Sequence, residues 1–413
     1  MEQNIKKINR SIKIQPLFSA FSDDLIFLVP IDTLFLTITK GLNASQIQFM
    51  TMLSMIVGIL SRKLLLNISK KIGNIRSLRL GSFLLLVSAV ILTFSNQFPI
   101  ICFYRIVFEL AFIFLHMALI VLKNNLQSIN KGADYFKIRN KTKIMYSITT
   151  MITSLLSGYL FNLNNYLPMF LQILLCIVMF SMSFLFFEAE AKNDTTVQKD
   201  TNEKINMNKI TLLIILSFAL STTIIKLGQN NSKLFMQYDF QKLLSTEILT
   251  YYITVIVFIS RISRLLGNII FGKLYKKFKD KINIIITILL ILAFILLIIG
   301  HFLNIDLIYK VIIMSIGFFL ILATRDSFKV YLEDVALENT NKEEQQKVLI
   351  DMEIYRKVLS LVGSATFTLI LLKYELIVIE FVLLGMCIIE LFINKKLYKS
   401  LKEIKSHWWF LIS

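Results

Sequence analysis

Acidic side chains interrupt an apolar stretch near the start of the sequence. Residues 20–35 read AFSDDLIFLVPIDTLF and contain Asp23, Asp24 and Asp32. An ionised side chain inside a bilayer is costly unless it is paired or faces a water-filled cavity. At helical spacing, Asp24 and Asp32 are separated by about 12 Å of rise and about 80° of rotation, so they can share a broad face. The stretch therefore predicts a membrane helix that lines a polar path, with a kink at Pro30.

A second group of ionisable residues, Arg105, Glu109 and His116, follows one stripe of a predicted helix. If the first helix runs outward and this one runs inward, Asp32 and Arg105 lie at similar depth, and we expect them to pair. A nearby cation favours an ionised carboxyl group and burial opposes it, so such a ladder is suited to proton coupling. Alternatively, Arg105 and Glu109 neutralise each other along one helix, and His116 is a packed polar residue. Asp23 has its own alternative, as a cap of the helix start.

Two arginines, Arg261 and Arg264, lie near the middle of a predicted span over 247–272. They are three residues apart and therefore share a helix face. Guanidinium groups bind carboxylates and phosphates in bidentate geometry. The pair is predicted to bind an anionic or zwitterionic substrate, or the acids of the N-terminal half. The alternative is that it holds loops or backbone carbonyls in place.

Other charges in the later spans have plainer interpretations. Gating or lipid contacts on the cytoplasmic side are expected for Arg325, Asp326, Glu353, Arg356 and Lys357. Glu380 and Glu390 lie in the last span. Two interpretations remain for them, contact with neighbouring helices or contact with lysines of the C-terminal tail.

Several classes of function are excluded by what the sequence lacks. It contains no Gly-Lys-Ser/Thr phosphate loop, no cluster of metal ligands and no nucleophile elbow. Cys102, Cys176 and Cys387 lie in apolar runs and are interpreted as reduced core residues. The basic charge is not interleaved with aromatic residues in a soluble domain, which argues against nucleic-acid binding. We therefore expect neither an enzyme nor a cofactor.

Long apolar runs must position these residues. The sequence is 56% hydrophobic, its mean hydropathy is +0.68, and its apolar runs are about twenty residues long, enough to cross a bilayer. No cleavage site follows the basic N-terminus, so no cleaved signal peptide is expected. Twelve transmembrane helices are predicted, over 17–39, 45–68, 77–96, 98–122, 142–163, 165–188, 210–229, 247–272, 282–303, 306–328, 352–373 and 375–394.

Charge patterning orients these spans and divides the chain. Most of the 45 Lys and Arg residues lie at the termini and in alternate loops, which predicts cytoplasmic termini in the inner membrane. This distribution also explains the net charge of +18 as attraction to anionic lipid headgroups. The predicted parts are a six-helix bundle over 1–188, a cytoplasmic linker over 189–208, a second six-helix bundle over 209–396 and an interfacial tail over 397–413.

Related basic segments follow the second and eighth spans, NISKKIGNIRS at 67–77 and KLYKKFKDKIN at 273–283. Together with twelve spans in two halves, they resemble the major facilitator superfamily (MFS) of secondary transporters over almost the whole chain. The loop signature of that family has the form Gly-x-x-x-Asp-(Arg/Lys)-x-Gly-(Arg/Lys). Four residues match it, namely Lys71, Gly73, Gly272 and Lys277. Lys70 and Lys276 stand at the position of its aspartate.

The resemblance implies two six-helix bundles related by a pseudo-two-fold axis and transport by alternating access. Arg105 stands where the family often has an arginine, whereas residues 146–161 lack the Gly-Pro signature of its drug/proton antiporters. We expect a proton-coupled transporter of a small solute that contacts membrane lipids, acts as a monomer and binds no nucleic acid. Efflux, uptake of an anionic or zwitterionic nutrient, and a non-transporting sensor or immunity protein on the same fold remain open.

Overall fold

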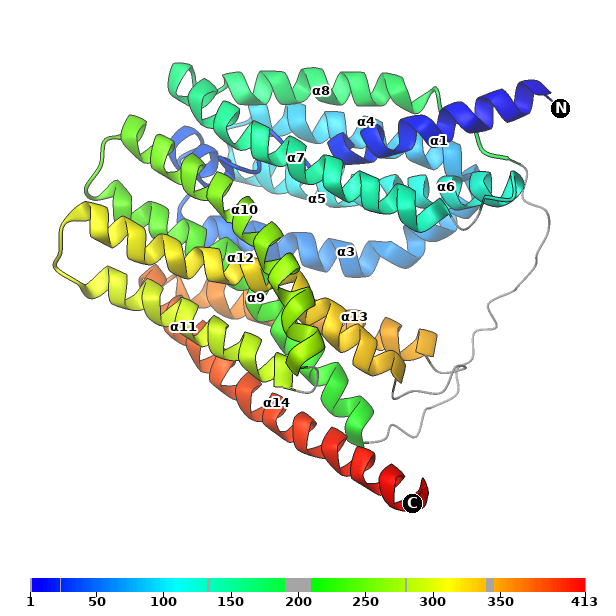
Figure 1. Ribbon diagram of the computed structural model, residues 1–413. Coiled ribbons are helices and arrows are strands. Elements are labelled where there is room, and N and C mark those ends of the chain that lie inside the picture. The colour runs from blue at the N-terminus through cyan, green and yellow to red at the C-terminus, as the bar shows by residue number, and fades with distance from the viewer. Residues whose placement is uncertain are drawn as a thin grey trace. The chain divides into compact units, whose positions relative to one another are not determined.

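The fold is known from a computed structural model, which describes residues 2–22, 24–131, 134–189, 209–278, 281–338 and 345–412. These residues form helices and short connections, and no strand occurs among them (Figure 1). The prediction of an all-α membrane protein is confirmed. Contacts within the chain divide it into two compact units: unit 1 contains Met1–Asn202 and Thr250–Phe258, and unit 2 contains Glu203–Leu249 and Ile259–Ser413.

Nine helices in the described ranges are long and apolar enough to cross a membrane. They correspond to all of the predicted spans except the first, sixth and eleventh. The sixth is a shorter apolar helix, Leu167–Ser183. The first is interrupted, and the eleventh carries a polar start, QQKVLIDMEIYRK.

Unit 1 is built around α4, which packs against α5 and α8, while α3 packs against α5 and α1 against α7. Its elements are α1 (Glu2–Ser22), α2 (Asp32–Leu34), the π-helix η1 (Phe35–Thr39), α3 (Ala44–Ile72), α4 (Asn74–Phe94), α5 (Phe98–Leu115), α6 (Met117–Ser128), α7 (Asp134–Leu163) and α8 (Leu167–Ser183).

The prediction of one kinked helix over 17–39 is wrong. Helix α1 begins at Glu2 and ends at Ser22, and helical structure resumes only at Asp32. Between them, residues 26–31 form turns. Pro30 has no amide hydrogen to give a continuous helix. The helical spacing between Asp24 and Asp32 therefore does not apply, and Asp23 lies outside the described residues.

Unit 2 is organised around α9, which packs against α11, α12, α13 and α14 (Figure 1). Its elements are α9 (Lys209–Gln241), most of α10 (Thr246–Phe278), α11 (Ile282–Phe302), α12 (Leu307–Glu338), α13 (Gln345–Ile370) and α14 (Leu376–Ile412).

The predicted end of the seventh span at residue 229 is also wrong, because α9 continues to Gln241. Its last turns are polar in sequence, yet Asn231, Ser232, Gln237 and Asp239 are all buried by neighbouring helices. Burial of one face stabilises a helix independently of its sequence propensity. In sequence, the polar end of α9 therefore resembles a loop.

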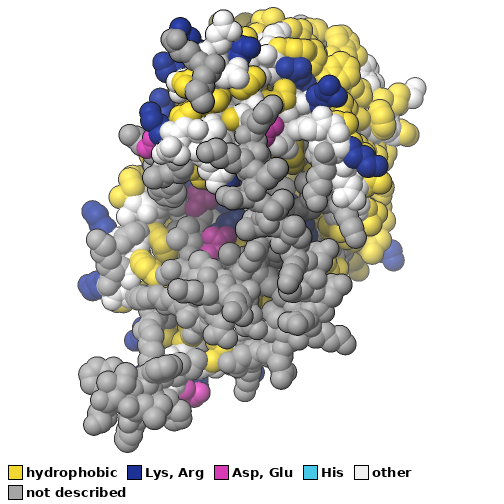
Figure 2. Space-filling model, turned by 90° about the vertical axis from the view of Figure 1, so that its right-hand side faces the viewer, with side chains coloured by type: hydrophobic (Ala, Val, Ile, Leu, Met, Phe, Trp, Pro, Cys, Tyr) yellow, Lys and Arg dark blue, Asp and Glu magenta, His cyan; other side chains and the backbone are white. Residues whose placement is uncertain are grey.

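Exposed apolar side chains cover the outer faces of the helices. Leu60 is 75% exposed, Leu369 67% and Phe392 66%, as is appropriate for surfaces that face lipid. Figure 2 views the side on which the N-terminus lies and shows Lys and Arg side chains at several places there, with fewer Asp and Glu. Residues 190–208 of the predicted linker, and the side chains of Trp408 and Trp409 in the tail, lie outside the described residues.

Candidate functional site

The interrupted segment between α1 and α2 is buried in unit 1. Leu25, Ile26 and Ile31 are at most 1% exposed. Short-range bonds satisfy part of the backbone, including those from the amides of Leu28 and Val29 to the carbonyl of Leu25, at 2.8 and 3.0 Å. Non-helical backbone is tolerated at membrane depth only where protein surrounds it or where it lines a water-filled cavity.

Side chains complete the hydrogen bonding of this segment. The carboxylate of Asp24 accepts from the amide of Leu25 at 3.0 Å, and that of Asp32 accepts from the amide of Thr33 at 2.7 Å. The buried amide oxygen of Gln172, on α8, accepts from the amide of Phe27 at 3.0 Å. Both acids are thus fixed at the two ends of the break, one before it and one after it.

Arg105 and Tyr104, on α5, bring a cation and a phenol to the same acids. Asp24 and Glu109 are the acidic residues that act electrostatically on Arg105. Asp24 and Asp32 both act on the phenol of Tyr104. Asp24 and Glu109 are therefore near Arg105, and Asp24 and Asp32 are near Tyr104, all within unit 1. Tyr104 belongs to the same group, although no sequence pattern indicates it.

Glu109 is held against α3. Its carboxylate accepts a hydrogen bond of 2.7 Å from the hydroxyl of Ser54. A methyl group built on Gly58 would lie 2.6 Å from the other carboxylate oxygen. A side chain at Gly58 would therefore displace the carboxylate, so this glycine makes room for the half-buried acid.

His116 does not extend the group in the described contacts. It is exposed at the junction of α5 and α6, and its Nδ1 is 2.6 Å from the carbonyl oxygen of Phe112, one turn earlier in the same helix. That contact is the one expected of a packed or surface polar side chain at a helix end.

The two arginines of α10 have different surroundings. Arg264 makes a bidentate pair with Asp326 of α12, with Nε–Oδ2 at 2.7 Å and Nη2–Oδ1 at 2.8 Å. Asn268 donates to the same carboxylate at 3.1 Å. Within the described residues, Arg261 has a buried Nε that makes no hydrogen bond. Arg264 thus has its anion inside unit 2, a pairing the sequence analysis did not assign.

Of the four residues that match the loop signature, three lie at helix ends, namely Lys71, Gly73 and Lys277. Gly73 joins α3 to α4 with a φ of +87°, a conformation that favours glycine. Lys71 is exposed. Gly272 lies within α10, which continues past the predicted end of its span. Lys277 is exposed, and its ammonium group lies 5.3 Å from the ring centroid of Phe278.

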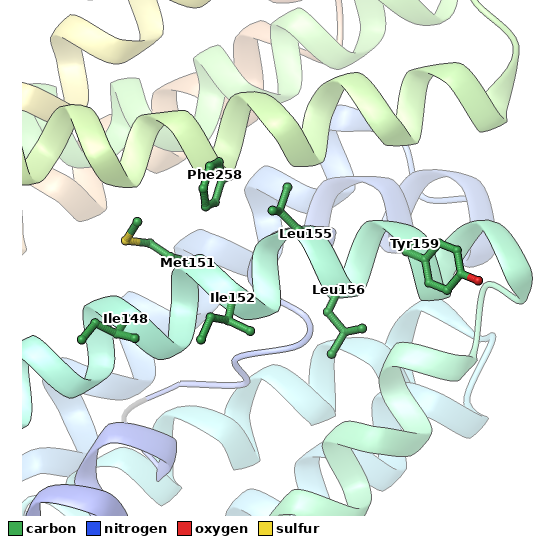
Figure 3. Close-up of a pocket in the computed structure, with 7 residues that line it drawn as sticks. All are labelled: Ile148, Met151, Ile152, Leu155, Leu156, Tyr159 and Phe258. Atoms are coloured by element: carbon green, nitrogen blue, oxygen red, sulfur yellow. The ribbon is translucent and has the colours of Figure 1, made fainter.

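An apolar pocket in unit 1 lies apart from these charges. Residues of α7 between Ile148 and Tyr159 line it together with Phe258 (Figure 3). It contains none of the charged candidates, and the Tyr159 hydroxyl is the one polar side-chain group among its lining residues. It suits an acyl chain or another apolar group better than an ion.

Solved structures share this fold. The nucleoside transporter NupG matches with a TM-score of 0.69 at 11% identity, over 97% of this chain and 100% of that one. A bacterial homologue of the iron transporter ferroportin matches with a TM-score of 0.67 at 12% identity, over 95% and 98%. The xylose transporter XylE from E. coli matches with a TM-score of 0.66 at 12% identity, over 94% and 96%.

Sequence comparison identifies the family. No curated protein sequence matches this chain. The family model of the Major Facilitator Superfamily matches residues 17–335. This range includes the interrupted segment, the charged group of α5 and both arginines of α10. The chain therefore belongs to the Major Facilitator Superfamily and is a membrane transporter rather than an enzyme.

Proposed function

We propose that this chain is a proton-coupled secondary transporter of a small solute, and that the interrupted segment of unit 1 is its coupling site. The observation that carries the proposal is the combination of a broken membrane segment with two acids, Asp24 and Asp32, that act on neighbouring groups of α5. Discontinuous helices in transporters place free backbone groups and charges beside substrates and coupling ions.

The chemistry available to this group supports coupling. A buried carboxylate beside Arg105 is favoured in its ionised form, and loss of that neighbour favours the protonated form. A conformational change that moves Arg105 away from Asp24 would therefore change the proton affinity of that carboxylate. By linkage, protonation would then bias the conformational equilibrium. A solute that binds the carboxylate in place of Arg105 would change its proton affinity in the same way.

We infer a narrower class of solute than the family as a whole transports. The group combines carboxylates, a guanidinium and a phenol, which suits a polar, uncharged or zwitterionic molecule. The structural neighbours include transporters named for nucleosides and xylose, and both of these are hydroxylated solutes. Because the pocket beside Tyr159 is apolar, we assign the polar solute to the interrupted segment and not to that pocket.

A second candidate is uptake of an anionic nutrient. It is favoured by Arg261, whose Nε is buried without a hydrogen bond in the described residues. Arg264 already has the carboxylate of Asp326, so Arg261 is the better candidate for a solute anion. On this alternative, Arg261→Gln abolishes binding of a carboxylate solute, whereas Asp32→Asn preserves it.

The test begins with a ligand and then measures coupling. A thermal-shift panel of nucleosides, pentoses, dicarboxylates, divalent metal ions and cationic dyes, applied to the purified full chain, selects the solute. Transport of that solute is then followed in proteoliposomes with an imposed pH gradient. We expect Asp32→Asn to abolish gradient-driven accumulation, while downhill exchange persists.

The matched control is Asp306→Asn, the same change at an exposed acid, which should leave accumulation unchanged. Gradient-driven accumulation that survives in Asp32→Asn contradicts the coupling role. The absence of flux for every ligand that stabilises the protein would favour a non-transporting role on this fold. The direction of transport follows from inverted vesicles with an acidic interior, which accumulate the solute if the protein is a proton-driven exporter.

A further inference from the structure

Glu390, on α14, is a buried acid that the proposed coupling site does not use. Its side chain has no exposed surface. One carboxylate oxygen, Oε1, lies 2.6 Å from the hydroxyl of Ser221, 3.0 Å from that of Ser217 and 2.8 Å from the amide nitrogen of Asn394. The other oxygen, Oε2, is buried and makes no hydrogen bond within the described residues.

The surrounding cluster joins three helices of unit 2. The Asn394 amide nitrogen donates to the hydroxyl of Thr287, on α11, at 2.9 Å. Its amide oxygen accepts from Ser217, on α9, at 2.6 Å, and also from the amide nitrogen of Asn283. These are direct hydrogen-bond distances between protein atoms. A bound metal ion would instead hold its oxygen ligands apart, so the packing fits a proton better than a cation.

Each of the two serine hydroxyls beside Glu390 has one proton and two possible acceptors. The single hydroxyl proton of Ser217 is shared between Glu390 and the amide oxygen of Asn394. The single proton of Ser221 is shared between Glu390 and the carbonyl oxygen of Ser217. If Glu390 itself carries a proton, it can donate to one hydroxyl, and both serines are then free to donate to their other acceptors.

No cation balances a charge on Glu390 in the described contacts. The groups that face it from α9 and α11 are hydroxyls and amides. Charged or titratable groups on the elements around it include Glu380, Cys387, Lys395 and Lys396 on α14, Lys281 at the start of α11, Lys226, Lys233 and Asp239 on α9 with His301 of α11, and Arg356 with Glu353 on α13. None of these groups is among the hydrogen-bond partners of Glu390, which are Ser217, Ser221 and Asn394. Lys281, Lys395 and Lys396 are exposed, Asp239 pairs with His301 and Lys310, and Arg356 pairs with Glu353.

We propose that Glu390 is a proton-binding site that joins α9, α11 and α14, separate from the acids of unit 1. A buried carboxylate with no cation beside it and no donor at Oε2 is costly, whereas the neutral acid carries no charge and can donate from Oε1 to a serine hydroxyl. Loss of the proton leaves an uncompensated charge between the three helices and loosens their contact. Protonation of Glu390 does not depend on transport. An infrared result against it would therefore leave the proposed coupling role of unit 1 unaffected.

The test reads the protonation state directly by infrared spectroscopy of the purified full chain. A protonated carboxyl group has a carbonyl stretch that is resolved from the amide and carboxylate bands. We expect the difference between wild type and Glu390→Gln to show a protonated carboxyl at neutral pH, and the same difference in sodium chloride and in choline chloride. A carboxylate band in that difference, or conversion to one by sodium, overturns the proposal.

Two further variants keep the test decisive if Glu390→Gln does not fold. Ser221→Ala retains the acid and removes one hydroxyl that could stabilise its ionised form, so the loss of the carboxyl band on alkaline titration should move to higher pH, by about one unit. An unchanged titration contradicts the proposal. Glu380→Gln, at a second acid of α14 that has no exposed surface, is the matched control and should leave the Glu390 signal in place.

Discussion

The first membrane segments of the two units handle polar groups in different ways. In unit 1 the segment is broken between Ser22 and Asp32, and acids lie at both ends of the break. In unit 2 the corresponding helix, α9, is continuous for 33 residues, and its serines hydrogen-bond to the acids of α14. The broken segment of unit 1 therefore places acids beside a cation and a phenol of α5, whereas the serines of α9 surround Glu390 of α14 with neutral groups.

Removing the cation from the unit 1 group should have the largest effect. Arg105→Gln leaves Asp24 and Glu109 without their common positive neighbour. We expect gradient-driven transport to fall by about tenfold or more, which corresponds to about 1.4 kcal/mol of activation free energy. Arg79→Gln is the matched control, since both guanidinium groups lie over an aromatic ring, Arg105 at 5.1 Å from the Phe108 centroid and Arg79 at 4.8 Å from the Phe184 centroid. Equal losses in both variants would show that Arg105 has no special role.

Restoring helix continuity should test the break itself. Pro30→Ala supplies an amide hydrogen and removes the ring that disfavours a continuous helix, an effect of about 3 kcal/mol in a helix interior. We expect a several-fold loss of transport rate with no decrease in thermal stability. Pro16→Ala, inside the continuous helix α1, is the control and should leave transport unchanged. If Pro30→Ala transports normally, the interruption is not needed for function.

Crowding the carboxylate of Glu109 in unit 1 should have a smaller effect on transport. Gly58→Ala places a methyl group against a carboxylate oxygen of Glu109 and strains its hydrogen bond to Ser54. We expect a few-fold loss of transport and a modest decrease in melting temperature. Gly385→Ala, in α14 of unit 2, has open space around the added methyl group and should be neutral or slightly stabilising. The reverse order of effects would contradict the placement of Glu109.

Two lysines near helix ends, the buried Lys40 and the half-buried Lys310, extend the comparison. Lys40, in unit 1, donates to the carbonyl of Thr93 at 2.8 Å and to the side chain of Asn96 at 3.1 Å, with no carboxylate among these partners. Burial lowers the pKa of Lys40 from 10.5 to about 8. Lys310, in unit 2, instead pairs with Asp239 at 2.9 Å.

The pH dependence of Lys40 should be the smallest of these effects. Because its pKa is lowered in the folded state, the unfolded chain binds more protons between about pH 8 and 10.5, and stability from this group rises with pH across that window. Lys40→Met should remove this rise in melting temperature. Lys310→Met should instead destabilise the protein at neutral pH, since it leaves Asp239 with one cationic partner fewer. A pH profile unchanged by Lys40→Met would contradict the assignment.

Sequence patterns predicted most of the fold and part of the site. Apolar runs of about twenty residues locate helices because the bilayer requires them, and Arg105 and Glu109 stand out as charges in such a run. The polar end of α9 was missed, because burial of Asn231 and Gln237 by other helices cannot be read locally. Pro30 indicated a kink, but an interruption depends on acceptors such as Gln172, which is 145 residues from its partner.

Long-range pairs were the least predictable part of the site. Arg264 and Asp326 are 62 residues apart in sequence, and Ser221 and Glu390 are 169 apart. Each residue is visible as a polar group in an apolar run, but its partner is fixed only by helix packing. For the acids of α14, the sequence therefore allows either neighbouring helices or tail lysines as partners. The packing places Glu390 among hydroxyls and amides.

Accessibility of the two first segments tests the central comparison most directly. Single cysteines are introduced at residues 25–31 of unit 1 and at residues 215–221 of α9, in a background in which Cys102, Cys176 and Cys387 are replaced by serine, and are treated with a charged, membrane-impermeant thiol reagent. We expect labelling at the half-buried positions Phe27 and Val29, and protection of them by a transported solute, with none at Ser217 or Ser221. Unlabelled cysteines throughout 25–31, or equal labelling of both segments, would contradict the account.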